Sequence, residues 1–412
     1  MSGLAAIESI RSEFPALERV HAGSSVAYFD GPGGTQVPRV VAEAVSNYLL
    51  GHNANTHWGF PTSAETDRII ADGREAAADL VGGATHEIVF GANMTTLTFR
   101  LARALGRQFA PGTEIVVTQL DHRANVDPWL DMAHMWNLTV HTVPFRPSDG
   151  MLDWDVFESV VGERTGLIAI GGASNALGTA NDVPRAAALA RRAGSLLFVD
   201  AVHSAPHLPT DVSALGCDAL ACSPYKFYGP HAGVLWVRLS LLESLHVPKL
   251  LPASDEAPER LETGTLSHEA IAGTTAAIDF LADLDDGPGT RRERLLRVME
   301  GLHDRGDSLV RRLWDGLEAL DGVRTFGPAP GTAERTPTVS FIVDGVSSSE
   351  VSRRLAEECG VFCSYGDFYA SDVAERLGVE AEGLVRAGCA CYTTESEVDR
   401  LVRGVAQIAA AG

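Results

Sequence analysis

The sequence alternates between short β-rich runs and helical segments from Glu87 to Val237, and this alternation constrains the fold more than any other feature. The runs read EIVF, TEIVVT, NLTVHTV, GLIAIGG, SLLFVD, DALACS and GVLWV. Between them, Thr95–Leu105 and Val183–Ala193 contain few helix-breaking residues. Near-continuous apolar strands that alternate with helices are typical of a mostly parallel sheet buried between helices. We therefore expect a large α/β domain.

A change in composition marks the end of this domain. The segment DLDDGPG is acidic and carries Gly and Pro, and a long Arg-rich amphipathic stretch follows it. Further along come TVSFIVDG, an EVSRRLAEEC helix, LVRAGCACY and a terminal helix, in the order of an α+β unit. At 412 residues the chain is long enough for two domains. We expect a large domain over residues 30–280 and a smaller α+β domain built from 1–29 and 281–412.

Charge and composition exclude several classes of function. A net charge of −21 opposes binding to nucleic acid or to an anionic membrane. The amino-terminal residues carry Glu8, Glu13 and Glu18 and lack the apolar core of a signal peptide, and no run of roughly 18 uncharged apolar residues occurs. The six cysteines have no matching histidine cluster, so we expect small buried thiols and no metal site. These features favour a cytoplasmic protein.

Lysine is scarce in this chain, which contains only Lys226 and Lys249. An enzyme that forms a Schiff base needs a lysine whose amine is neutral and confined. Lys226 lies in DALACSPYKFYGPHAG, directly after an apolar run and before a Gly-bearing turn, whereas Lys249 lies in the amphipathic stretch HVPKLL. Lys226 is therefore the candidate for covalent attachment of a cofactor.

Polar residues follow several of the predicted strands. Asp200 ends SLLFVD and His203 follows it, His122 follows IVVTQLD, and Asn175 follows GLIAIGGAS. Ligands of open parallel sheets gather beyond the carboxyl ends of the strands, where all of these residues fall. These groups suit a cofactor that contains a pyridine ring with a phenolic oxygen. An ionised acid can pair with the ring nitrogen, an imidazole can stack on the ring, and an amide can bond the phenolic oxygen. Each residue alone is more simply a turn residue, but together they predict one site.

The segment EIVFGANMTTLTFRLARAL supplies a strand, a short turn and a helix, so that the positive end of the helix can face an anion. Thr95 and Thr96 stand at the start of that helix. Ser223 and Tyr225, beside Lys226, provide further hydroxyl groups. These residues predict a phosphate site, although Thr95 could also be an ordinary helix cap.

On these residues the whole chain resembles the class V aminotransferase-like enzymes, which use pyridoxal 5'-phosphate (PLP) and share fold type I. The group includes cysteine desulfurases and related lyases. The resemblance runs from about Tyr28 to the carboxyl end and covers both expected domains. It lies in YFDGPGGTQVP, DHRANVDPW, SNALGT, VDAVHSAPHLPTDVSALGCDALACSPYKFYGPHAGVLW and ETGTLSHEAIAG.

The resemblance implies a PLP cofactor, an amino-acid substrate and a homodimer. Lys226 would hold the cofactor as a Schiff base and move the proton at the substrate α-carbon, and His122 would stack on the ring. Arg386, in LVRAGCACYTT, matches the arginine that holds an α-carboxylate by a two-pronged bond. The implied cofactor contacts are Met94, Thr95, His122, Asn175, Asp200, His203, Ser223, Tyr225 and Lys226, with Thr265 acting from the other subunit.

One segment departs from the desulfurase pattern. Desulfurases carry a nucleophilic cysteine on a small-domain loop, and that segment here reads GVFCSYGDFYA, with Tyr369 at the cysteine position and Ser364 in place of the usual arginine. Cys363 lies earlier, on the strand side. GDFYA is closer to the branch that includes carbon–sulfur lyases of ergothioneine-type and other secondary pathways. Tyr369 would then lie near the substrate side chain, as a hydrogen-bond donor or as a wall.

The leading hypothesis is a PLP-dependent β-lyase acting on a cysteine S-conjugate. The alternatives are decarboxylation with oxidative deamination, transamination or epimerisation of an amino acid, and a desulfurase that uses the displaced Cys363. A catalytically idle scaffold with the same fold is a further alternative, which the joint presence of Lys226, Asp200 and Arg386 opposes. Neither the substrate side chain nor the bond that breaks follows from the sequence.

Overall fold

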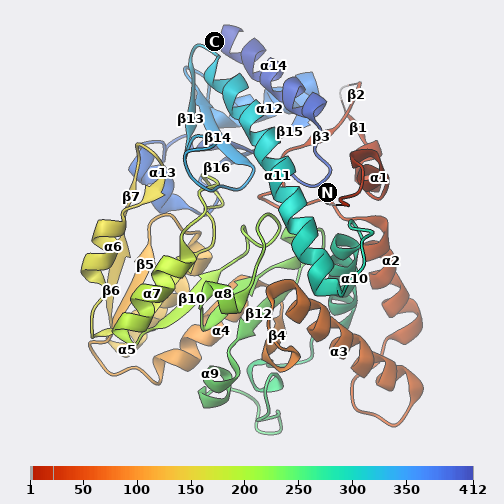
Figure 1. Cartoon of the computed structure of the whole chain (residues 1–412), viewed down its shortest axis with the longest axis vertical. Coiled ribbons are helices and arrows are strands. Elements are labelled where there is room, and N and C mark those ends of the chain that lie inside the picture. Colours follow the sequence, from red (N-terminus) through yellow and green to blue (C-terminus); the bar gives the residue numbers. More distant parts are fainter. Residues whose placement is uncertain (1–2, 22, 412) are drawn as a thin grey trace.

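A seven-stranded sheet forms the centre of the larger half of the molecule in the computed structural model, which describes residues 3–21 and 23–411 (Figure 1). The strand order is β4-β12-β11-β10-β9-β5-β6, and β12 alone runs antiparallel to its neighbours. The mostly parallel sheet expected from the sequence is thereby confirmed. Its strands are β4 (Ile88–Gly91), β5 (Glu114–Thr118), β6 (Thr139–Val143), β9 (Thr165–Gly171), β10 (Leu196–Asp200), β11 (Ala219–Cys222) and β12 (Gly233–Val237).

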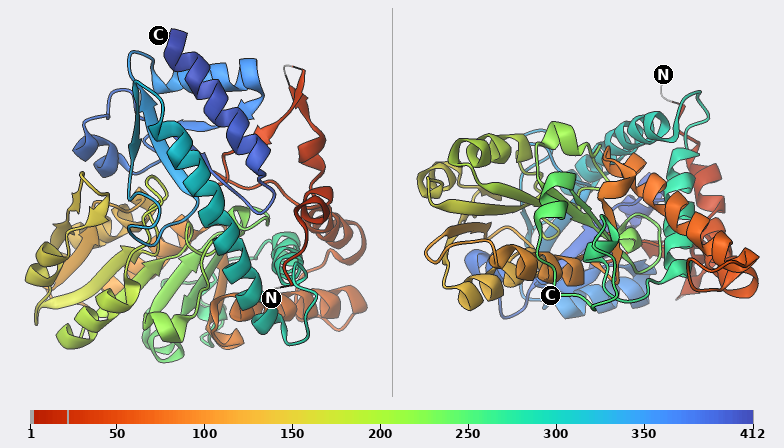
Figure 2. Two further views of the ribbon diagram at one scale, coloured as in Figure 1. Left: turned by 45° about the horizontal axis from the view of Figure 1, so that its top comes forward. Right: turned by 90° about the horizontal axis from the view of Figure 1, so that it is seen from below.

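Helices cover both faces of this sheet, which explains why its central strands are mostly apolar (Figure 2). Successive residues of a strand point to opposite faces. In β5, Ile115 and Val117 pack with α4 (Met94–Gly106) and α5 (Asp127–Trp136), whereas Val116 packs in the core that includes α3 (Pro61–Val81) and α7 (Val183–Ala193). Each strand thus contributes to two cores.

A second, smaller sheet lies in the upper half of Figure 1. It is antiparallel, in the order β13-β14-β17-β16, and is made of β13 (Val323–Phe326), β14 (Thr338–Val343), β17 (Leu384–Gly388) and β16 (Ser364–Gly366). Its buried residues pack with α12 (Ser348–Cys359) and α14 (Glu395–Ala411). The long helix α11 (Arg291–Glu318), which starts at the capping box of Thr290 and Glu293, connects the two halves.

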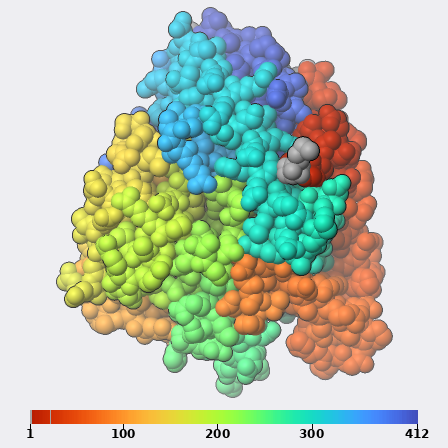
Figure 3. Space-filling model, in the orientation of Figure 1, coloured from red at the N-terminus to blue at the C-terminus, as the bar shows by residue number. Residues whose placement is uncertain are grey.

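The amino-terminal segment packs beside the second sheet. Strand β3 (Ala27–Tyr28) pairs with β15 (Val361–Phe362), and Arg11 donates to the Tyr392 carbonyl and to Glu397. In the space-filling view, residues near the two ends of the chain, in red and blue, lie against each other (Figure 3). Asp30 follows β3 and forms a bridge with Gly388, so the chain enters the space between the two sheets at this point.

The remaining elements are short or peripheral to the site. None of the described helices is both long and apolar enough to cross a membrane. The elements are α1 (Ile7–Ser12), α2 (Arg39–Asn47), α6 (Trp154–Val160), α8 (Val212–Leu215), α9 (Leu239–Ser244), α10 (His268–Ala282), α13 (Ser371–Leu377), β1 (Val20–His21), β2 (Ser24–Ser25), β7 (Phe145–Arg146) and β8 (Met151–Leu152).

Candidate active site

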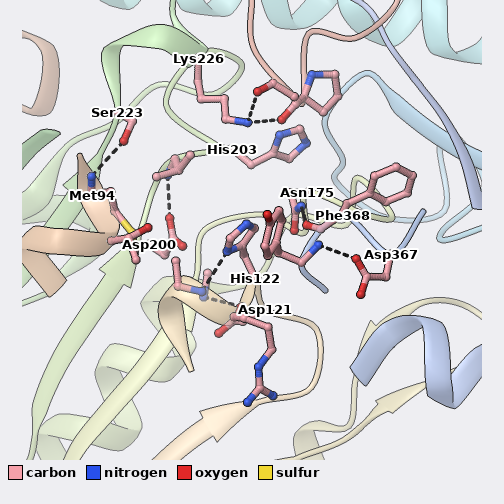
Figure 4. A pocket seen from close by; sticks show the side chains of 18 of the residues that line it. Met94, Asp121, His122, Asn175, Asp200, His203, Ser223, Lys226, Asp367 and Phe368 are labelled. Carbon is pink, nitrogen blue, oxygen red and sulfur yellow. Dashed lines mark hydrogen bonds between the residues drawn. The ribbon is translucent and has the colours of Figure 1, made fainter. Parts of the chain in front are cut away.

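The carboxyl ends of β11, β10, β9 and β5 open onto one cavity of about 690 Å³. Lys226 follows β11, Asp200 ends β10, Asn175 follows β9 and His122 follows β5, and all four line the cavity (Figure 4). They meet because neighbouring parallel strands end at the same edge of the sheet. All the cofactor and substrate contacts implied by the resemblance line this cavity except Thr265, which lies in a separate hollow beside His57 and His268. Thr96, also expected at the phosphate site, and Cys363 are not part of the cavity wall.

The Lys226 amine is held by a loop of the amino-terminal segment. Its Nζ donates to the carbonyl oxygens of Pro32 and Gly33, the latter at 2.9 Å, and lies 4.8 Å from the centre of the Tyr225 ring. A Cβ at Gly33 would lie 2.5 Å from the Asp30 carboxylate, so a larger residue there would displace the Asp30 side chain. Burial, followed by the nearby Arg386 charge, lowers the pKa of Lys226 to about 7. A large fraction of this amine is therefore neutral and nucleophilic near neutral pH.

Amine labelling of the cofactor-free protein as a function of pH measures the pKa of Lys226 directly. Because the pKa is lowered from 10.5 to about 7, the neutral form predominates above about pH 7, and labelling of Lys226 should rise with a midpoint there. Peptide mapping after acylation resolves the two lysines of the chain. Labelling that begins only above about pH 9 would contradict the expectation.

Two buried carboxyl groups line the cavity. Asp200 is 7% exposed and its Oδ1 accepts the Val202 N–H at 2.9 Å, and burial raises its pKa to about 6. Asp121, which sequence reasoning missed, accepts from Gly171 N–H at 2.8 Å and from the Asn125 amide at 3.0 Å. Burial and the Asp200 charge raise the Asp121 pKa to about 8. Asp200 is thus the more acidic member of the pair.

The two histidines of the site are uncharged at neutral pH. Burial lowers the pKa of His122 to about 4, and its Nδ1 accepts the Ala124 N–H at 2.9 Å, which places the proton of the neutral ring on Nε2. Burial also holds the pKa of His203 well below 6.5, and its Nε2 lies 2.9 Å from Thr336 Oγ1. A neutral, flat imidazole is suited to stacking on an aromatic ring.

The amino terminus of α4 faces the same cavity. Met94 N–H donates to Ser223 Oγ at 3.2 Å, and Thr95 is an exposed residue of the cavity wall. Asn93 caps the helix by accepting from Thr96 N–H at 2.8 Å. The positive end of a 13-residue helix and the hydroxyl groups of Thr95, Ser223 and Tyr225 together suit an anion such as phosphate.

Arg386 lies on β17 at the small-sheet side of the cavity and is 3% exposed. Its guanidinium donates to the Asn175 carbonyl at 3.0 Å and to Ser364 Oγ at 3.2 Å, but its buried Nε has no partner among the described residues. Burial lowers the pKa of Arg386 to about 10, so it stays cationic. A buried cation with an unused donor suits a substrate carboxylate.

Strand β16 and the turn that follows it form one wall of the cavity, and we call residues 364–370 the lid. Phe368 packs on the guanidinium of Arg386 at 4.0 Å, and Tyr369 stacks on His122 with ring centres 5.5 Å apart. Both residues have positive φ angles, 58° and 56°, which cost about 1–2 kcal/mol each in a non-glycine residue.

Two bonds from the segments that follow β9 and β5 hold the lid in this conformation. Asn175 Nδ2 donates to Phe368 O at 2.9 Å, and Arg123 N–H donates to Tyr369 O at 2.7 Å. The amide N–H of Asn175 is therefore engaged by the lid, and its predicted bond to a phenolic oxygen stays a prediction. Sequence reasoning also missed Phe368 and Arg123, because their contacts join segments far apart in the chain.

Cys363 points away from this chemistry. It is 9% exposed, it is not part of the cavity wall, and burial raises the pKa of its thiol far above the ordinary value. A thiol in this state is a poor nucleophile. The cavity residues fit PLP on their own chemistry, since they supply an anion site, an ionised acid, a flat imidazole, a neutral amine and a cation with an unpartnered Nε.

Comparisons with known proteins identify the family of the chain. Residues 27–401 match the family model described as aminotransferase class V. A cysteine desulfurase of Serratia proteamaculans is 31% identical, with 98% of each chain covered, and an aminotransferase-like protein of Gibberella zeae is 32% identical, with 96% of each covered. The apo structure of a cysteine desulfurase from Thermococcus onnurineus NA1 superposes with a TM-score of 0.89 at 27% identity, covering 100% of both chains.

Proposed function

The chain belongs to the class V aminotransferase family and is a PLP-dependent enzyme of fold type I, and from this premise we propose that it is a carbon–sulfur β-lyase. Its substrate would be a cysteine S-conjugate or a similar amino acid. A conjugate and water would give a thiol, pyruvate and ammonia; a sulfoxide conjugate would give a sulfenate in place of the thiol.

The residues of the cavity suit this reaction. The α4 amino terminus with Thr95 and Ser223 would hold the phosphate, Asp200 would face the ring nitrogen, and Arg386 would hold the substrate carboxylate. Lys226 would carry the proton from the α-carbon, since its pKa near 7 lets it both accept and return a proton. When bound, PLP supplies an electron sink at the α-carbon, which allows a sulfur group to leave the β-carbon without a protein nucleophile.

The composition of the lid carries the proposal. Residues 364–369 bring three hydroxyl groups, three aromatic rings and one carboxylate to the cavity, and Tyr369 occupies the place where the resemblance puts a cysteine in desulfurases. Persulfide transfer needs an accessible thiolate there. A β-lyase needs only room for the leaving group above Lys226.

A panel of cysteine conjugates tests the proposal through its products. Pyruvate and ammonia in equal amounts support a β-lyase, and failure to form pyruvate from any conjugate contradicts it. Formation of alanine together with sulfane sulfur would show a desulfurase. Formation of pyridoxamine phosphate would show a transaminase, and oxygen uptake with release of carbon dioxide would show an oxidative decarboxylase.

We also propose a homodimer, because Thr265 is exposed and lies outside the cavity of its own chain. A second copy would bring this hydroxyl group to the phosphate. Apolar side chains exposed in the same region support an interface, among them Leu50, Trp58 and Phe60. Light scattering should give twice the chain mass of 43.7 kDa, and a monomer that retains PLP would contradict the dimer.

A further inference from the structure

Three lid residues that the proposed reaction does not use face the mouth of the cavity. Tyr365, Asp367 and Tyr369 alternate along the chain, all line the cavity, and all are exposed. Tyr365 is 55% exposed and Tyr369 72% exposed, which is high for aromatic side chains in a cavity wall. Figure 4 shows Asp367 and Phe368 on the side of the cavity opposite Asp200. The lid thus brings two exposed phenol rings and one exposed carboxylate to the cavity.

The lid backbone holds these groups in place before any substrate arrives. Asp367 Oδ1 accepts the Tyr369 N–H at 3.0 Å, and no hydrogen bond from the described residues reaches its Oδ2. Tyr369 is fixed further by Arg123 N–H on its carbonyl and by its stacking on His122. A ligand at the mouth would therefore meet a preorganised carboxylate oxygen and aromatic ring.

Asp367 is a carboxylate of the cavity wall that takes part in no ion pair among the described residues. Arg123 already pairs with Asp372 at 3.1 Å and with Asp127. The Arg386 guanidinium, on the other side of the lid, is covered by the Phe368 ring. An anionic side chain would be repelled here, whereas a cation would gain from Asp367 and from the faces of the two rings.

We propose that Tyr365, Asp367 and Tyr369 form a subsite for a cationic side chain, an ammonium or guanidinium group that the substrate carries beyond its sulfur atom. The proposal rests on the β-lyase function and specifies its substrate class. Arg386 already shows the same chemistry within the cavity, since the Phe368 ring packs on its guanidinium at 4.0 Å. Neutral aromatic substituents would also stack on the tyrosines, but they would gain nothing from Asp367.

Binding of analogues to the PLP-loaded enzyme after borohydride reduction tests the subsite without any need for turnover, because the reduced cofactor cannot form an imine with the amine of an analogue. Three thioethers of 3-mercaptopropionate, with S-aminoethyl, S-propyl or S-carboxyethyl groups, keep the carboxylate for Arg386 but lack the α-amino group. By calorimetric titration the aminoethyl compound should bind roughly tenfold more tightly than the propyl compound, and the carboxyethyl compound most weakly. Raising the ionic strength should reduce the ratio of the aminoethyl affinity to the propyl affinity.

Variants assign the preference to named residues. Asp367→Asn and Tyr369→Leu should each lower the aminoethyl-to-propyl ratio by several fold, while Tyr369→Phe, which keeps the ring, should retain it. Glu380→Gln removes an exposed carboxylate of the same domain that lies outside the cavity, and it should leave the ratio unchanged. Failure of the aminoethyl compound to bind more tightly than the propyl compound would overturn the proposal, as would an unchanged ratio in Asp367→Asn.

The two proposals fail separately. Preference for the aminoethyl analogue depends on the lid alone and survives even if no conjugate yields pyruvate. Conversely, the enzyme could release pyruvate from S-propylcysteine and yet bind the aminoethyl analogue no more tightly than the propyl analogue. That result would support the β-lyase and contradict the subsite.

Discussion

The Lys226→Ala variant should lose covalent attachment of PLP and about a hundredfold to ten-thousandfold of its rate. Both losses follow from the proposal that one amine holds the cofactor and moves the α-proton. No second lysine is available, because Lys249 Nζ is engaged by the Ala253 carbonyl at 2.6 Å and by Asp255, outside the cavity. Borohydride reduction followed by peptide mass mapping measures the attachment, and pyruvate release measures the rate.

Lys249→Ala is the matched control, since it removes the other lysine of the chain and should keep both properties. Thermal unfolding of the two cofactor-free variants checks that each is folded. Reductive incorporation of PLP into Lys226→Ala at the level of the unaltered protein would show that this lysine does not bear the cofactor.

Substitution of Arg386 should act on substrate binding. Arg386→Met should lower kcat/KM about thirtyfold to several thousandfold, corresponding to about 2–5 kcal/mol for truncating one partner of a buried charge pair. The kcat/KM of Arg386→Lys should fall between those of the unaltered enzyme and of Arg386→Met, because an ammonium keeps the charge but loses the planar fork. Steady-state kinetics separates the expected rise in KM from any change in kcat.

Arg335 provides a control for the loss of a buried arginine. It is 3% exposed, its pKa is also lowered to about 10 by burial, and its donors go to the carbonyl oxygens of Pro328 and Thr338 outside the cavity. Arg335→Met should lower the unfolding temperature without the rise in KM. An unaltered KM in Arg386→Met would remove this residue from the carboxylate site.

Local signals predicted much of the fold. The helix expected over Val183–Ala193 has those bounds, because Asp182 caps its start by accepting from Arg185 N–H and Gly194 ends it with a φ of 70°. The seven β-rich runs became the seven strands of the large sheet. Capping residues, glycines and apolar periodicity act within a few positions of the chain, so the sequence displays them directly.

The sequence by itself also determined which residues stand at the strand ends, since neighbouring parallel strands bring their carboxyl ends to one edge and so join Lys226, Asp200 and His122. Only the tertiary structure decided how the lid meets them. Asn175 and Arg386 are 211 positions apart, and their bond exists because the small sheet packs over the large one. The neutral amine of Lys226 depends on the same packing, because burial and the nearby Arg386 charge lower its pKa, and no local pattern encodes either.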